Sequence, residues 1–332
     1  MKTIPPLRFE PWVRPMVWGS QRLHSVLGRN FQAPAQYGES WELSDHPASE
    51  SRIAPSPWSA GIVNGSLRTL MAEMPESLLG KSVPTHHGRF PLLVKWLDAA
   101  DWLSVQVHPD STVVKKLLPS EESKTEAWLI LEASPESRIW AGLKAGVCEA
   151  TVREALALGT LSDCLHCFTP KPGQFLFLPA GTIHAVGGGV LMAEIQQTSD
   201  ATFRLFDWNR VDPTGKPRQL HLEESIASIH WNNKPSELVS IPGFGTLTDS
   251  CHVILVECPF FRLSYIRETK AFSLGGDGKA KILVVVGGEG KGIYQGRCDT
   301  LKLGDTVLIP ASSGELEIQP CKGMELWIGE PL

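Results

Sequence analysis

The sequence has few tyrosines, no block of like charge and no long apolar run, and each absence excludes a class of protein. Three tyrosines occur in 332 residues, and 31 lysines and arginines stand against 36 aspartates and glutamates, for a net charge of −5. Nucleic-acid-binding proteins typically carry a basic patch with stacking aromatic side chains, so this composition excludes nucleic acid as a partner. The longest apolar runs, such as residues 282–286, are far too short to cross a bilayer, which excludes a membrane helix.

Neither a secretory signal nor a disulfide framework is visible. Residues 1–12 lack the apolar segment and the small-residue cleavage site that a secretory signal requires. The cysteines number seven, and they are scattered at positions 148, 164, 167, 251, 258, 298 and 321. Secreted proteins usually pair an even number of cysteines, so this pattern predicts free thiols and a cytoplasmic protein.

Turn residues are abundant, and they separate short apolar runs. The sequence has 30 glycines and 25 prolines, and its runs of strand length lie at 90–97, 102–108, 174–178, 190–196, 253–257, 281–286, 306–309 and 315–319. Helical periodicity predicts helical insertions in three segments only, at about 66–80, 111–118 and 149–167. Because strands and helices do not alternate regularly, a parallel doubly wound sheet is disfavoured. The pattern predicts a mainly β protein of the sandwich or barrel type.

One segment of the chain recurs in outline further along. Residues 173–184 read G-x5-P-x-G-x2-H, and residues 304–315 preserve this frame, with Ser312 in place of the second glycine and Glu315 in place of the histidine. Physically, the frame is a turn, an apolar strand, a proline-marked turn and a polar residue at the start of the next strand. It resembles the second sequence motif of the cupin superfamily, whose fold is the double-stranded β-helix form of the jelly roll.

Two copies of the motif imply two cupin units with a small helical insertion. At about 150 residues per domain, the length of the chain also favours two domains. The polar, proline-containing stretch 232–238 predicts the boundary between them. We therefore expect a catalytic, metal-binding cupin domain with the helical insertions at 1–235 and a degenerate cupin domain without a metal site at 236–332.

Polar side chains interrupt two of the apolar segments at alternate positions. Because residues i and i+2 point to the same face of a strand, Gln106 and His108 share a face, and so do Lys124 and Glu126. His184 enters from the repeated motif. Two imidazoles, one carboxylate and one amide oxygen around Zn²⁺ leave room for water or substrate, which is typical of a catalytic site rather than a closed structural one.

The segments around these residues resemble the three metal-bearing motifs of type I phosphomannose isomerases. These segments are Leu103–Asp110, Lys124–Trp128 and Pro179–His184, and further likeness lies at residues 17–20, 38–44, 91–98, 194–204 and 205–210. The likeness runs from about residue 11 to residue 210 and continues weakly through the second cupin. In the order of its motifs and in its length, the chain is similar to the short bacterial form of the family.

The resemblance implies a metal, a reaction and a substrate. It implies that Gln106, His108, Glu126 and His184 hold one Zn²⁺ per chain. The implied reaction is the reversible interconversion of D-mannose 6-phosphate and D-fructose 6-phosphate, in which a proton moves between C2 and C1 of the opened sugar through a cis-enediol. The expected partner is therefore a phosphorylated hexose.

Five further residues match positions of the family's active site. Arg204 matches the active-site arginine, and its permanent charge suits the stabilisation of an oxyanion. Lys124 and Glu194 are alternative candidates for the proton-transfer base. The sequence leaves open a salt bridge or a phosphate contact for Lys124, and a buried pairing with Arg204 for Glu194. Ser104 and Arg210 resemble the family's phosphate contacts.

Two other functions compete with the isomerase. A cupin with two histidines and one carboxylate could hold Fe(II) as an oxygenase does. Gln106 and the basic residues Lys124, Arg204 and Arg210 favour a redox-silent metal and a phosphorylated substrate instead. A non-catalytic sugar-binding or regulatory cupin would be expected to have lost Arg204 or a ligand, and this chain keeps them all.

Overall fold

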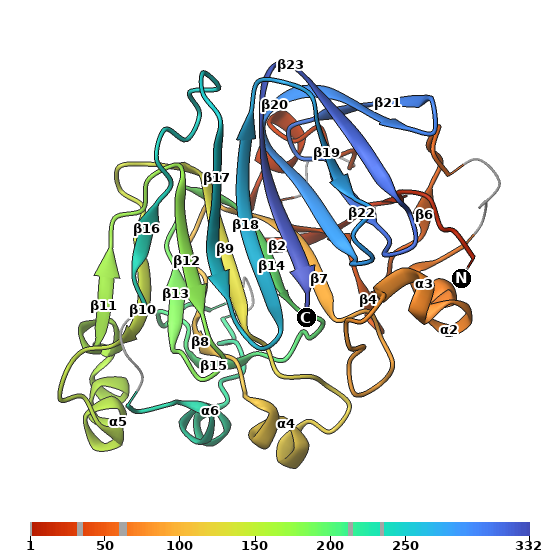
Figure 1. Cartoon of the computed structure of the whole chain (residues 1–332). Coiled ribbons are helices and arrows are strands. Elements are labelled where there is room, and N and C mark those ends of the chain that lie inside the picture. The colour runs from red at the N-terminus through yellow and green to blue at the C-terminus, as the bar shows by residue number, and fades with distance from the viewer. Residues whose placement is uncertain (1, 32–35, 60–64, 212–214, 233–235) are drawn as a thin grey trace.

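Antiparallel β-sheets make up most of the computed structural model, which describes residues 2–31, 36–59, 65–211, 215–232 and 236–332 (Figure 1). This confirms the mainly β class that the turn-punctuated apolar runs predict. All seven cysteines are free, as their scatter predicts. No helix in the described ranges is both long enough and apolar enough to span a membrane.

Two sheets built from residues 12–240 face each other. The first has seven strands in the order β16 (Leu238–Ser240), β12 (Gln174–Leu178), β9 (Glu126–Ala133), β14 (Val190–Gln197), β7 (Leu92–Ala99), β3 (Tyr37–Leu43) and β2 (Trp12–Ser20). The second has five strands in the order β11 (Leu165–Phe168), β10 (Ile139–Leu143), β13 (His184–Val186), β8 (Val105–Val107) and β15 (Phe203–Phe206). An apolar layer that includes Leu97, Trp128 and Met192 fills the space between them.

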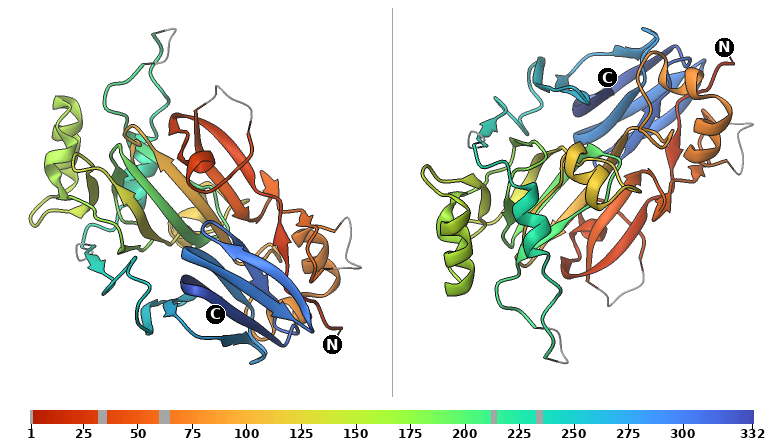
Figure 2. Two further views of the ribbon diagram at one scale, coloured as in Figure 1. Left: turned by 90° about the horizontal axis from the view of Figure 1, so that it is seen from above. Right: turned by 90° about the horizontal axis from the view of Figure 1, so that it is seen from below.

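The last quarter of the chain, from residue 251, forms another seven-stranded sheet. Its central path is β17 (Cys251–Glu257), β18 (Phe261–Glu268), β23 (Glu315–Pro331), β20 (Lys281–Tyr294) and β21 (Arg297–Lys302), with β19 (Phe272–Gly275) paired to β23 and β22 (Thr306–Ile309) paired to β20. Two-stranded ribbons join β1 (Arg8–Phe9) to β6 (Ile53–Ala54) and β4 (Asp45–His46) to β5 (Ser49–Glu50). The C-terminal strands, blue in Figure 2, lie beside the yellow and green strands in both views.

Neighbouring residues of the first seven-stranded sheet face different cores. Trp96 and Ile195 pack against Leu263 and Trp327 of the C-terminal sheet. Leu97, on the other face of β7, packs toward the five-stranded sheet. A period of two along each strand therefore fills both cores, and it leaves Lys95 and Glu194 pointing toward the five-stranded sheet.

The helices are short. They are α1 (Arg22–Ser25), α2 (Leu67–Glu73), α3 (Pro75–Leu79), α4 (Ser111–Leu117), α5 (Glu149–Leu158) and α6 (Leu222–Ser228), with the 3-10 turn η1 (Leu161–Cys164). The predicted insertions at 66–80 and 111–118 are present, the first as two helices that meet at Met74, where Pro75 begins α3. Helices α1 and α6 have no counterpart in the prediction.

The predicted insertion at 149–167 is wrong in its second half. Helix α5 ends at Leu158, because Gly159 adopts a left-handed conformation (φ 72°) and caps it. The chain then makes the turn η1 and continues as strand β11, which pairs with the edge strand β10. Residues 165–168 form a strand because they pair with β10, and this long-range pairing cannot be seen in the periodicity of the sequence.

The repeated frame corresponds to the same local structure twice. In residues 173–184 it forms β12, a turn and the start of β13, and in residues 304–315 it forms β22, a turn and the start of β23. The first glycine of each copy has positive φ, 76° at Gly173 and 91° at Gly304, a conformation that strains other residues. Glu315, at the position of the histidine, is solvent-exposed.

The predicted boundary between residues 235 and 236 falls at the edge of residues 233–235, which lie outside the described ranges. Beyond it, β16 still pairs with β12 of the first sheet, and the C-terminal sheet begins at β17. The division into domains at 1–235 and 236–332 stays a prediction.

Arg29, which forms a buried ion pair with Glu42, links the first part of the chain to the turn between β21 and β22 of the C-terminal sheet. Arg29 donates to both carboxylate oxygens of Glu42 (2.9 and 2.8 Å) and to the carbonyl oxygen of Gly304. Replacing Arg29 by methionine is expected to lower the free energy of unfolding by about 3–5 kcal/mol, because Glu42 loses its buried partner. Changing Glu42 to glutamine in the same chain should restore part of the loss. Urea unfolding of both variants tests this, and equal stability of Arg29→Met and the unchanged protein would contradict it.

Candidate metal centre and active-site pocket

Strand β8 brings three predicted site residues into one row across the five-stranded sheet. Gln106 lies opposite His184 of β13 on one side and opposite Arg204 of β15 on the other. Val105 and Val107 face the other way, into a core that α5 and α6 complete. The alternation predicted for this segment is therefore confirmed.

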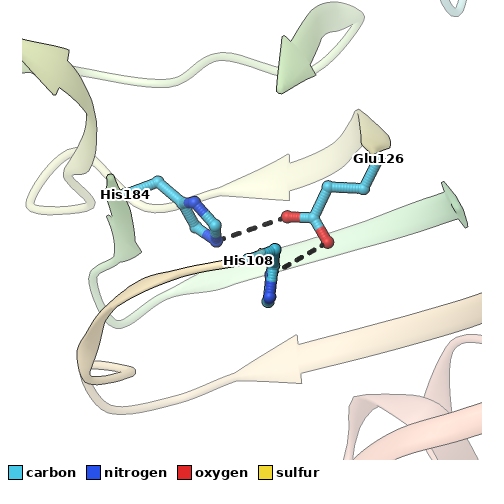
Figure 3. A group of neighbouring side chains, drawn as sticks. All are labelled: His108, Glu126 and His184. Atoms are coloured by element: carbon cyan, nitrogen blue, oxygen red, sulfur yellow. Dashed lines mark ion pairs between the residues drawn. The ribbon is translucent and has the colours of Figure 1, made fainter. Parts of the chain in front are cut away.

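Glu126 comes from the facing seven-stranded sheet and completes a buried group of three with His108 and His184. It is the first residue of β9, and its Oε2 lies 3.3 Å from His108 Nε2 while its Oε1 lies 3.3 Å from His184 Nε2 (Figure 3). One donor atom from each residue lies within 4.8 Å of the other two. The exposed fraction of each residue is 1–2%.

Backbone carbonyls fix how the two imidazoles are protonated. His108 Nδ1–H donates to the carbonyl oxygen of Ala201 (2.8 Å), and His184 Nδ1–H donates to that of Thr182 (2.9 Å). Burial lowers the pKa of both histidines, that of His184 to about 3, so each ring is neutral and turns an unprotonated Nε2 toward Glu126. This is the orientation in which histidine binds a metal.

The electrostatics of the group fit a cation. Although burial opposes ionisation, the charge of Lys124 holds the pKa of Glu126 well below its usual range. Two nitrogen lone pairs and a carboxylate facing one another repel unless a positive charge lies among them. The Lys124 ammonium contacts Glu126 Oε2 and His108 Nε2 (the latter at 3.0 Å), whereas Glu126 Oε1 is buried without a hydrogen-bond partner. This donor set suits Zn²⁺ or a similar divalent ion.

Gln106 lies beside the group as the predicted fourth ligand. Its amide nitrogen donates to His184 Nε2 at 3.3 Å. Rotating the terminal amide by half a turn would put its oxygen where its nitrogen now lies, beside His184 Nε2, because the two ends of the amide are nearly equal in size.

A cavity of about 300 Å³ adjoins the group. Gln106 and Lys124 line it and also touch the His108–Glu126–His184 group, so they connect the two. Three more of the predicted residues line it, namely Ser104, Glu194 and Arg204. Ser104 is buried, with 4% of its surface exposed.

Glu194 is a buried carboxyl in the wall of this cavity. Trp128 Nε1–H donates to its Oε2 (2.9 Å), and its Oε1 lies 3.7 Å from Lys95 Nζ and 3.9 Å from Lys124 Nζ. Burial raises its pKa to about 7, against the charges of both lysines. Its partners are these residues rather than Arg204, the pairing that the sequence left open.

Known proteins match this chain over nearly its full length. A family model described as the catalytic domain of type I phosphomannose isomerase matches residues 7–136. Mannose-6-phosphate isomerase ManA of Bacillus subtilis is 32% identical over 327 residues, which cover 96% of this chain and 96% of that one. The chain belongs to the type I phosphomannose isomerase family. The resemblance in the sequence motifs is thereby confirmed.

Two further comparisons agree with this assignment. The mannose-6-phosphate isomerase of Streptococcus mutans is 32% identical over 320 residues, covering 94% of this chain and 96% of that protein. A crystal structure of the mannose 6-phosphate isomerase from Bacillus subtilis superposes with a TM-score of 0.84 at 26% identity, covering 98% of this chain and 99% of that one. The chain is thus a phosphomannose isomerase family enzyme over its full length, the C-terminal sheet included.

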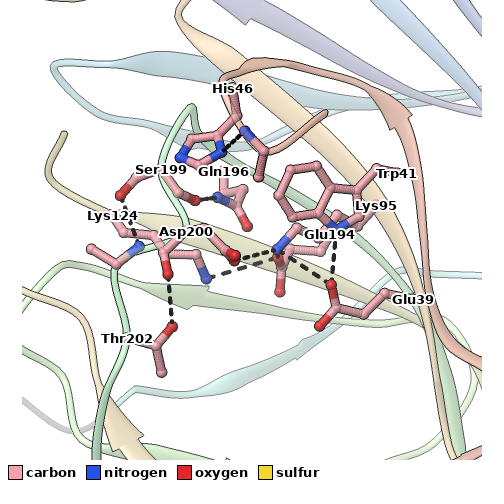
Figure 4. Close-up of polar contacts among 12 residues, drawn as sticks. Glu39, Trp41, His46, Lys95, Lys124, Glu194, Gln196, Ser199, Asp200 and Thr202 are labelled. Atoms are coloured by element: carbon pink, nitrogen blue, oxygen red, sulfur yellow. Dashed lines mark hydrogen bonds and ion pairs between the residues drawn. The ribbon is translucent and has the colours of Figure 1, made fainter. Parts of the chain in front are cut away.

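Sequence reasoning missed a second charged cluster in this family member's cavity. Lys95, 4% exposed, lies 3.7 Å from Glu194, 3.8 Å from Asp200 and 4.0 Å from Glu39, and its Nζ stands over the Trp41 ring at 4.7 Å (Figure 4). The signal was available, because Lys95 interrupts the apolar run 92–97 of β7 and a buried lysine is rarely without a partner.

Lys124 is paired within the site, whereas Arg210 turns away from the cavity. Lys124 forms an ion pair with Glu126, one of the roles that the sequence left open for it, and although burial opposes it the charges of Glu126 and Glu194 raise the pKa of Lys124. Arg210 does not line the cavity; its guanidinium binds Asp207 (2.6 Å) and the carbonyl oxygen of Trp102.

Proposed function

We propose that the chain is a zinc-dependent isomerase that interconverts D-mannose 6-phosphate and D-fructose 6-phosphate through a cis-enediol. The observation that carries the proposal is the joining of the His108–Glu126–His184 group, through Gln106 and Lys124, to a cavity lined by acidic and basic side chains. Membership of the family supports the reaction, because its curated relatives carry that name.

Gln106, His108, Glu126 and His184 are the residues that would hold the metal. A divalent ion bound there would polarise the oxygens on C1 and C2 of the opened sugar and stabilise the negative charge that develops on them. Zinc suits two imidazoles with oxygen donors, and it does not change its oxidation state during a proton transfer.

Glu194 is our candidate for the proton-transfer base. Its Oε1 is buried in the wall of the cavity without a hydrogen-bond partner, and a pKa of about 7 suits a group that must both take and return a proton. In the proposed step Glu194 takes the proton from C2, the C–H electron pair forms the C1=C2 double bond, and the C1 carbonyl oxygen is protonated. Return of the proton to C1, with loss of the proton on the C2 hydroxyl, gives the ketose.

Arg204 is the candidate for holding negative charge. Its Nη1 donates to the carbonyl oxygen of Gln219 (2.8 Å), whereas its Nε is buried without a partner. A guanidinium that lines the cavity with a donor to spare suits an oxyanion or a phosphate, and it cannot serve as the base because it does not lose its proton.

The proposal predicts that a chelator abolishes the formation of fructose 6-phosphate from mannose 6-phosphate and that added Zn²⁺ restores it. The readout is a coupled assay, together with metal analysis of each sample. Absence of turnover by the fully metallated protein would contradict the proposal and favour a sugar-binding cupin. Restoration by Fe(II) alone, with uptake of oxygen, would favour the oxygenase.

A further inference from the structure

The segment that follows β15 returns to Arg204 and is hydrogen-bonded to it. The Arg204 backbone N–H donates to His221 Nδ1 (3.2 Å), the His221 N–H donates to the Arg204 carbonyl oxygen (2.8 Å), and Arg204 Nη1 donates to the Gln219 carbonyl oxygen (2.8 Å). These bonds hold residues 219–221 beside the first residues of β15. Arg218, the residue before them, lines the same cavity as Arg204 and Ser104.

Arg204 and Arg218, two of the three arginines that line the cavity, have little negative charge of their own to neutralise them, whereas the third, Arg14, pairs with Glu39 and Asp200. Arg218 Nη1 lies 3.5 Å from Asp207, at the limit of a hydrogen bond, and Arg210 holds the same carboxylate oxygen at 2.6 Å. Arg204 Nε has no partner. Burial and the charges of Arg218 and, to a smaller extent, Arg210 lower the pKa of Arg204, so Arg204 lies among like charges, of which Arg218 has the largest effect.

The acidic residues of the cavity are engaged elsewhere. Glu39, Glu194 and Asp200 all lie within 4.0 Å of Lys95. Arg204 and Arg218 therefore form a positively charged part of the cavity, with the buried hydroxyl of Ser104 in the same wall. A doubly charged anion placed there would relieve the repulsion, and two planar guanidinium groups match the oxygens of a phosphate.

We propose that Arg218, together with Arg204, binds the phosphate group of the substrate, and that Arg210 is a structural residue that holds Asp207. The inference rests on the proposed function, because it assigns the phosphate of that substrate. It replaces the phosphate role that the sequence motif suggests for Arg210 with a residue eight positions further along.

Kinetics of Arg218→Met with mannose 6-phosphate test the assignment. We expect KM to rise about 10- to 100-fold, since a charge-assisted contact to phosphate is lost, and the inhibition constant of inorganic phosphate to rise in parallel. Arg218→Lys should recover part of both, because it keeps the charge without the paired geometry. Metal content should stay at the level of the unchanged enzyme.

Arg153→Met is the matched control. Arg153 is exposed to a similar degree (37% against 33% for Arg218) and is also paired to carboxylates, but it lies on α5. We expect no change in KM or in phosphate inhibition. The proposal is overturned if Arg218→Met leaves both constants unchanged, or if Arg210→Met raises them and Arg218→Met does not.

Phosphate binding separates this inference from the proposed function. Should the metallated protein fail to isomerise mannose 6-phosphate, calorimetric titration with inorganic phosphate still compares the unchanged protein with Arg218→Met. Weaker binding by the variant would support the assignment of Arg218, and equal binding, or no binding by either, would overturn it.

Discussion

Glu126→Gln is expected to yield a protein that binds almost no metal and loses isomerase activity by about a thousandfold or more. Glutamine has nearly the same volume as glutamate, so the buried site keeps its shape and loses only the charge. Without the carboxylate, only the Nε2 atoms of His108 and His184 and neutral amide groups remain as ligands. This uncharged set holds a divalent ion far less strongly. Metal analysis after dialysis and the fructose 6-phosphate assay measure the two effects.

The same change removes the partner of a buried lysine. Lys124 contacts Glu126 and is 4% exposed, so we expect a lower melting temperature as well. Glu121→Gln is the matched control, because Glu121 also pairs with a histidine, His46, at 3.2 Å but lies outside the metal-ligand group. It should keep the metal. A Glu126→Gln protein with one tightly bound metal per chain would show that the ion lies elsewhere.

Local rules of the chain predict well where the residues of the candidate metal group lie. The period of two along strands puts Gln106 on the face opposite Val105 and Val107, and the glycine and proline positions of the repeat place His184 at the start of a strand. Both inferences need only neighbouring residues. The strand order that brings Glu126 to the two histidines follows from the fold that the repeat indicates.

The second charged cluster depends on long-range pairing that no local pattern contains. Lys95 meets Glu194 because β7 pairs with β14 in a register that puts the two residues opposite each other, and it meets Glu39 because β3 is the next strand. The sequence shows that Lys95 is unusual, but not which carboxylates surround it.

A turn explains why the phosphate contact predicted at Arg210 lies outside the cavity. Trp208 and Asn209 both have positive φ (56° and 55°), a conformation that is uncommon for residues other than glycine. The chain reverses there, and Arg210 points back to Asp207, three residues earlier. Spacing from Arg204 alone could not reveal the reversal, whereas Arg218 reaches the cavity through the hydrogen bonds of the returning segment.

Glu194→Gln is expected to lower kcat about 10²- to 10⁴-fold with metal content unchanged, because glutamine cannot accept the proton. In the unchanged enzyme, the pH range in which kcat/KM falls should identify the base; this falling part of the pH profile is called the limb below. Glu194 acts as a carboxylate and its pKa is about 7, so kcat/KM should fall as the pH drops below about 7. If Lys124 were the base, the limb would lie in the alkaline range, because the pKa of Lys124 is raised from its ordinary value.

Lys95→Met gives an independent check on the same limb. The positive charge of Lys95 lies 3.7 Å from Glu194 and lowers the pKa of that carboxyl against the effect of burial. Removing the charge raises the pKa of Glu194, so more of it is protonated at neutral pH and the limb moves to higher pH. Arg153→Met, which changes a side chain on α5, is the control and should show no shift of the limb. A limb that stays in place in Lys95→Met would mean that a group other than Glu194 takes the proton, with Lys124 then the leading candidate.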